Sequence, residues 1–220
     1  MELLLSVKRG KFRSDDPSLE MNTKEFKAIR PTILDRDDHK CRFCDFRALK
    51  YQEVHHADDD HSNNSEDNLI TVCPLCHACF HIGLTGLKSR GRLIYLKTNV
   101  HITQPMLNNF VRILWVASES NDPSLVSLSS NLLKRLEKSH INAKRHLGTS
   151  DPAVIANSLL NDDDLYDNGR ENLFKNVFLL PEKEGFLQAF QYWKKETFKT
   201  IPLNQWVSIA ENKAPSLGLI

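Results

Sequence analysis

The sequence predicts an α+β protein in which a small metal-binding module, residues 1–100, is followed by a helical region, residues 101–220. Three observations predict this class. All five cysteines lie between residues 41 and 79, in CxxC spacing. Short apolar runs typical of strands flank these cysteines. After residue 102, apolar residues recur at helical spacing instead.

Composition and charge narrow the class of protein. A chain of 220 residues has room for one domain, or for a small module with a helical domain. The net charge of +1 gives no overall basic field of the kind that attracts nucleic acid. The start, MELLLSVKRGK, is too short and too soon charged for a signal peptide, and no apolar run approaches the ~20 residues of a membrane span. We therefore expect a cytoplasmic protein with no direct membrane insertion.

Local patterns predict the elements of the first part. Asn22 and Glu25 resemble a capping box that would begin a helix, and Pro31 predicts a kink or two shorter pieces within it. In chain order we expect a strand over 2–7, this helix over 23–37, a turn at CRFCDF, a strand over 49–56, a polar loop over 57–67, a strand at NLITV, a helix from about Pro74, a glycine-containing loop over 83–91 and a strand over 92–98.

Helix-start signals predict four helices in the second part. They are Thr103 with Pro105, the pairs Asp122-Pro123 and Asp151-Pro152, and Pro181. The apolar stripes that follow, such as Phe186, Phe190 and Trp193, are typical of ordinary core. The polar stretch 161–174 is expected to be a connection.

The spacing of the cysteines predicts a structural zinc site. Cys41 and Cys44 form one CxxC pair, and Cys73 and Cys76 form a second after 28 intervening residues. Two such turns supply four thiolates, the closed tetrahedral geometry of structural zinc. Cys76 and Cys79 form a CxxC pair as well, so Cys79 is an alternative ligand to Cys73. We prefer Cys73 because the strand NLITV leads directly into it, which leaves Cys79 as a small buried hydrophobe.

The histidines around this zinc frame resemble those of the HNH, or ββα-metal, nuclease module. The pattern consists of His55-His56, Asn68 and the Cys76-His77 pair. The resemblance implies that His55 and His77 would bind a second, divalent catalytic metal, that His56 would be the general base, and that Asn68 would brace the loop that orients it. Such a site would use a neutral imidazole to activate water and a cation to stabilise charge on a phosphate.

A second resemblance covers most of the chain. The segments CRFCDFRALKYQEV, DNLITVCPLCHACF, GRLIYL and TSDPAVI are similar to those of the IcmJ/DotN family of type IVB secretion systems. The resemblance implies a cytosolic zinc protein of HNH-like fold that binds the coupling ATPase, through a tail segment of it, and acts as a structural adaptor at the inner membrane. The best-known members of that family lack the catalytic histidines, whereas this sequence has His55, His56, His77 and His81.

Local charge helps to separate the two functions. From Tyr51 to Leu87 there is no Lys or Arg, and the same 37 residues contain six acidic residues. Because phosphate contacts dominate affinity for nucleic acid, this segment disfavours a nucleic-acid partner. Basic residues do flank it, and they would either reach DNA or form a solvated face: Lys40, Arg42, Arg47, Lys50, Lys88, Arg90 and Arg92. We therefore predict a structural adaptor of a type IVB secretion or conjugation coupling complex, with a metal-dependent HNH endonuclease as the alternative.

Overall fold

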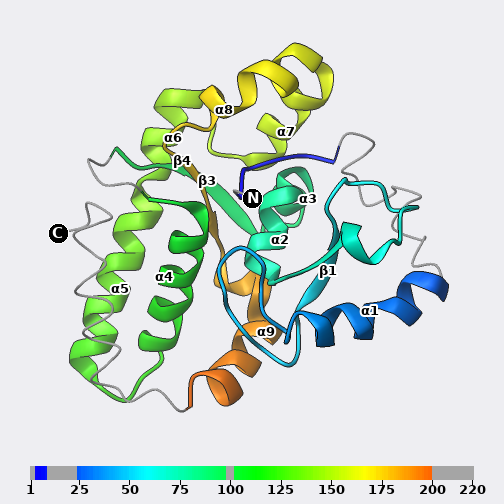
Figure 1. Ribbon diagram of the computed structural model, residues 1–220. Coiled ribbons are helices and arrows are strands. Elements are labelled where there is room, and N and C mark those ends of the chain that lie inside the picture. Colours follow the sequence, from blue (N-terminus) through cyan, green and yellow to red (C-terminus); the bar gives the residue numbers. More distant parts are fainter. Residues whose placement is uncertain (1–2, 9–23, 98–101, 200–220) are drawn as a thin grey trace.

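The computed structural model describes residues 3–8, 24–97 and 102–199, and within them the protein is a mixture of helices and two small sheets (Figure 1). The predicted α+β class is confirmed. The strands are β1 (Glu53–His56), β2 (Leu69–Val72), β3 (Gly91–Tyr95) and β4 (Val177–Pro181). The helices are α1 (Lys24–Arg36), α2 (Pro74–Phe80), α3 (Ile82–Leu87), α4 (Gln104–Ala117), α5 (Pro123–Lys138), α6 (His140–Leu147), α7 (Pro152–Asn161), α8 (Arg170–Leu173) and α9 (Leu187–Tyr192).

Strands β1 and β2 form an antiparallel hairpin that leads directly into α2. His55 lies opposite Ile70, and His56 lies opposite Leu69. Helix α2 begins at Pro74, as predicted, because proline fits the first turn of a helix, where no hydrogen-bond donor is needed. This ββα unit follows the turn that carries Cys41 and Cys44. The four cysteines of the two pairs lie close together, and most of the helices come later in the sequence.

The second sheet joins segments that are far apart in the sequence. Strand β3 pairs with β4 in antiparallel register, with Leu93 opposite Leu179. Every residue of β4 is buried. The main hydrophobic cluster continues from Leu3 through the cysteines to Phe198, so the core includes residues on both sides of residue 100. The division into residues 1–100 and 101–220 remains a prediction, and residues from both parts contribute to this one core.

Several helices begin where the sequence predicts. The side chain of Thr103 accepts a hydrogen bond from the Met106 amide at the start of α4. Asp122 and Asp151 cap α5 and α7 in the same way. Helix α1 spans Lys24–Arg36 as one continuous helix with Pro31 inside it, so the two shorter pieces do not occur, and a kink at Pro31 stays a prediction.

Other local predictions were wrong. The segment 83–91, expected to be a loop, contains most of α3. Its Gly86 lies against α7, where an added Cβ would meet the Ala153 nitrogen at 2.5 Å, so this glycine serves close helix packing. The segment 161–174, expected to be a polar connection, includes a π-helix, Leu165–Gly169, and α8. Strand β4 and helix α6 were not predicted.

The predicted strand at 2–7 is not a strand in its described part, residues 3–8. The Ser6 amide donates to the Cys79 carbonyl at 2.8 Å, and the Ile82 amide donates to the Ser6 carbonyl at 3.1 Å. This extended segment therefore occupies the junction of α2 and α3, and buries Leu3, Leu5 and Val7 there.

Within the described ranges, no helix is both long enough and apolar enough to cross a lipid bilayer.

Candidate functional site

Four cysteines form a compact buried cluster. The sulfurs of Cys41, Cys44, Cys73 and Cys76 all lie within 4.8 Å of one another. The Cys44 and Cys73 sulfurs are 3.6 Å apart. A zinc ion bound to four thiolates at about 2.3 Å separates neighbouring sulfurs by about 3.8 Å, so the cluster fits a tetrahedral metal ion. These four buried cysteines could hold a metal ion, and zinc is compatible with them.

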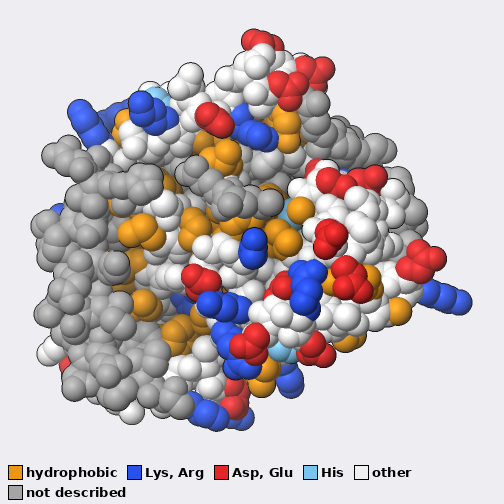
Figure 2. All heavy atoms as spheres, viewed as in Figure 1, with side chains coloured by type: hydrophobic (Ala, Val, Ile, Leu, Met, Phe, Trp, Pro, Cys, Tyr) orange, Lys and Arg blue, Asp and Glu red, His pale blue; other side chains and the backbone are white. Residues whose placement is uncertain are grey.

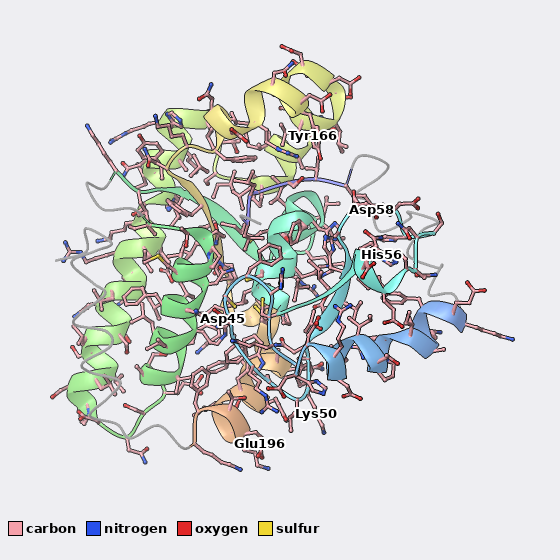
Figure 3. All side chains as sticks on the ribbon, viewed as in Figure 1. Asp45, Lys50, His56, Asp58, Tyr166 and Glu196 are labelled. Carbon is pink, nitrogen blue, oxygen red and sulfur yellow. The ribbon has the colours of Figure 1, made fainter. Side chains whose placement is uncertain are left out.

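Backbone hydrogen bonds hold both cysteine turns in place. The Cys41 amide donates to the Phe46 carbonyl at 2.9 Å, and the Asp45 amide donates back to the Cys41 carbonyl at 3.0 Å. The Arg42 amide donates to the Thr71 carbonyl at 2.9 Å, which ties this turn to β2. Cys73 is the residue that caps α2, so its sulfur lies at the start of that helix. Figure 3 shows the sulfur atoms between α2 and α4, near the labelled Asp45.

The fifth cysteine lies outside this set. Cys79 is fully buried, and its thiol donates to the Leu75 carbonyl at 3.3 Å, a bond within the turns of α2. Burial raises the pKa of the Cys79 thiol above its ordinary value, which keeps it protonated. The structure thus brings together the four cysteines that the sequence analysis preferred and leaves Cys79 as a small apolar residue.

Three histidines form a second cluster on the other side of α2. The ring centroids of His77 and His81 are 4.7 Å apart, and His55 on β1 lies 5.2 Å from His77 and 5.6 Å from His81. One nitrogen of each ring lies within 4.8 Å of the others, so the group could hold a metal ion. His81 was the member that the HNH pattern did not assign as a ligand. Its spacing of four residues from His77 was the available signal.

The protonation states of two of these histidines suit a metal ion. Burial and the neighbouring His77 lower the pKa of His55 to about 3, and burial lowers that of His81 well below its ordinary value. Both imidazoles are therefore neutral near pH 7, the form that binds metals. His77 differs, because its Nδ1 forms an ion pair with Glu53. Although burial opposes the charged form, this carboxylate raises the pKa of His77.

The contact between Glu53 and His77 was missed by the sequence analysis. A carboxylate on one ring nitrogen of a histidine orients the other nitrogen, an arrangement typical of histidine ligands of metals. A pocket of about 560 Å³ opens beside this pair and is lined by Tyr51, Glu53, His77, His81 and Arg90, together with the segment 184–189. Solvent therefore reaches the histidine cluster through His77 and His81.

His56 and Asn68, the remaining residues of the HNH pattern, lie next to the histidine cluster, where β1 leads into the following loop. His56 is only 6% exposed and stacks on Phe26 of α1, with ring centroids 5.1 Å apart. Its Nε2 is 3.0 Å from the Asn64 side-chain oxygen. Asn68 accepts from the Asp58 amide at 3.0 Å and donates to the Asp58 carboxylate at 2.8 Å, which fixes the loop after β1. Figure 3 labels His56 and Asp58 on this side of the molecule.

Comparison with known proteins finds a relative that shares most of the chain. The chain is 32% identical over 182 residues to the type 4 apparatus protein DotN of Legionella pneumophila, a match that covers 81% of this chain and 83% of that protein. The chain belongs to the DotN family. The resemblance to the IcmJ/DotN family is thereby confirmed. No protein-family model matches the chain. A match of 182 residues exceeds the first 100, so the similarity to DotN includes much of the helical region.

Because His55 of β1 is buried, the stability of the protein should depend on pH. The folded pKa of His55 lies near 3, below its ordinary 6.5, so between these values the unfolded chain binds a proton that the folded chain does not. Stability is therefore complete above about pH 6.5 and falls as the pH drops toward 3, by about 2 kcal/mol at pH 5 for this residue. Urea unfolding at pH 7 and pH 5 should show a smaller loss in His55→Gln than in the wild type. The exposed His146→Gln is the control, and an equal loss in all three proteins would contradict the assignment.

Proposed function

We propose that this protein is a cytoplasmic structural component of a type IVB secretion or conjugation coupling complex. It is recruited to the inner membrane by protein–protein contacts with the coupling ATPase, and it folds around one structural zinc. The observation that supports this function is the 32% identity to DotN over 182 residues, a length that requires both the cysteine region and the helices to be shared. A bare nuclease module would have no need of the helical region, whereas an adaptor uses helices as surfaces for a partner's peptide.

Zinc is the metal that the cysteine cluster fits best. A closed set of four thiolates is typical of structural zinc, since no position is left for substrate. When bound, zinc would cross-link the turn at Cys41 and Cys44 to the start of α2. Metal binding of order ~10 kcal/mol can decide whether such a unit folds.

Replacing one proposed ligand should unfold the protein. We expect about one zinc per chain in the wild type and an insoluble or unfolded Cys41→Ser variant. Cys79→Ser is the matched control, because it alters a cysteine that is equally buried but lies outside the cluster. Metal content and circular dichroism would check both. A soluble Cys41→Ser protein that unfolds cooperatively would refute the structural role. Loss of zinc from Cys79→Ser would show that Cys79 is a ligand in place of Cys73.

The adaptor function predicts a stable complex with the ATPase. The chain, co-expressed with the coupling ATPase of its own secretion system, should co-purify with it in fixed stoichiometry after nuclease treatment and on size exclusion. An ATPase that lacks its cytosolic tail is the control, and it should not retain the chain. Failure of the full-length ATPase to retain the chain while both proteins are soluble and folded would refute this partner.

The histidine cluster favours one second candidate, a metal-dependent HNH endonuclease. His55, His77 and His81 could hold a second divalent ion, with His56 as base and Asn68 as the brace of its loop. The position of His56 argues against this chemistry, because Phe26 covers its ring and Asn64 occupies its Nε2. A general base has to reach the water that it activates.

The charges around the cluster also argue against a nucleic-acid partner. Of the seven flanking bases that the sequence analysis left open, three form ion pairs with carboxylates. Lys40 pairs with Asp45 at 3.1 Å. Arg47 pairs with Asp38 at 2.7 Å, and Arg92 pairs with Glu182 at 2.5 Å. Figure 2 shows several acidic side chains on the right of its face, with Lys and Arg side chains among them. These carboxylates would repel a phosphate backbone.

A cleavage assay separates the two functions. We expect no cleavage of supercoiled plasmid in Mg²⁺ or Mn²⁺ by the wild type, His56→Ala or His77→Ala, with the same zinc content in all three proteins. Cleavage by the wild type that is lost in both variants, while the zinc stays bound, would establish the endonuclease instead.

A further inference from the structure

A buried arginine contacts the cysteine cluster from the helical part of the chain. Arg112 on α4 is 1% exposed, and its Nη2 donates to the Cys73 sulfur at 3.2 Å. Its Nη1 donates to the Asn109 side-chain oxygen at 2.6 Å. The guanidinium lies 3.8 Å from the ring centroid of Phe46 and 5.1 Å from that of Trp193, so two aromatic rings flank it.

Among the residues that the structure describes, no carboxylate pairs with this guanidinium. None of the ion pairs formed by the described residues includes Arg112. A buried charge is stable only when it is paired, so the negative charge has to come from the cysteines. Four thiolates around a divalent cation carry a net charge of −2, of which Arg112 would neutralise half.

Helix α4 makes two more contacts with the same centre. The Asn108 side-chain nitrogen donates to the Cys76 sulfur at 3.4 Å, and that of Asn109 donates to the Cys44 carbonyl at 2.9 Å. Positions 108 and 112 lie one turn apart, on the same face of the helix. Asn108 is itself held by Gln104, whose side chain exchanges hydrogen bonds with the Leu179 backbone of β4. These bonds connect the second sheet to the sulfur of Cys76.

We propose that α4 completes the metal centre, with Arg112 and Asn108 as positioning residues that stabilise the thiolates of Cys73 and Cys76. The proposal rests on the structural zinc proposed above. It makes metal retention depend on a helix outside the cysteine segment. Removal of the ion would therefore destabilise α4 as well, because Arg112 would lose the negative charge that it faces.

The test compares zinc retention in variants of the full chain. Arg112→Met removes the charge while keeping an unbranched side chain. Asn108→Asp preserves the acceptor for Gln104 but replaces the donor to Cys76 by a carboxylate. Transfer of zinc to a competing chromogenic chelator should show an affinity about 10- to 100-fold lower in both variants. Arg112→Lys, which keeps the charge but loses the planar fork, should fall between Arg112→Met and the wild type.

Two controls separate this role from packing. Phe46→Leu removes an aromatic partner of Arg112 and leaves its charge, so it should lower the melting temperature with little effect on zinc affinity. Arg135→Met removes an exposed arginine from α5 and should change neither. Equal losses of zinc affinity in Arg112→Met and Phe46→Leu would overturn the proposal, because Arg112 would then act through packing alone.

Cobalt provides a readout that packing does not move. Hydrogen bonds and a nearby cation lower the energy of the sulfur lone pairs, so their removal should shift the sulfur-to-cobalt charge-transfer band of the Co²⁺ protein to longer wavelength. We expect this shift in Arg112→Met, or in Asn108→Asp if the former does not fold, and not in Phe46→Leu. An unchanged band in the charge variants would overturn the proposal. A wild type without bound zinc would instead refute the structural zinc itself.

Discussion

The core is built around a buried cluster of four cysteine sulfurs and one guanidinium. Four cysteine sulfurs and one guanidinium lie in the same interior that holds Phe46 and Trp193, and solvent reaches none of them to any useful extent. Sulfurs without charge would leave Arg112 as an unpaired buried cation, and thiolates without a metal would repel one another. A divalent ion would resolve both difficulties, since it would bind the thiolates and leave a negative charge for the arginine. The proposed metal would therefore be bound within the core and not at its edge.

Helix α2 belongs to both clusters, and this explains how the histidines keep their arrangement. Cys76 faces the sulfurs, while the next residue, His77, faces His55 and His81. Phe80 connects the two sides, because it stacks on His55 at 4.2 Å and contacts Phe43 in the first cysteine turn at 5.3 Å. Any metal that fixes α2 also fixes the histidine positions. Their convergence is thus a consequence of the scaffold, and it would persist whether or not the site carries out chemistry.

The sequence predicted what is encoded locally. The two CxxC turns, the start of α2 at Pro74 and the caps at Thr103, Asp122 and Asp151 each depend on a few adjacent residues, and the structure has them in place. Long-range contacts were not predictable. Strand β4 forms because a strand about 85 residues earlier pairs with it, and Arg112 lies 39 residues from Cys73 on a helix whose pattern indicates ordinary core. An arginine is expected at the surface, so its role at the sulfurs had no signal in the sequence. The same holds for the contact of Glu53 with His77.

Two arginines of α1, Arg30 and Arg36, form hydrogen bonds with the backbone around β1 and β2. Arg30 of α1 donates to the Gln52 carbonyl at 2.7 Å, and Arg36 donates to the carbonyls of Glu66 and Leu69 at 2.7 and 2.8 Å. These bonds hold α1 across β1 and β2 and place Phe26 over His56. A nuclease would present such arginines to phosphate and leave its base open to water. Here the cations satisfy backbone carbonyls, and the helix that they anchor covers the histidine. The arrangement holds α1 against β1 and β2, which supports the structural role proposed above.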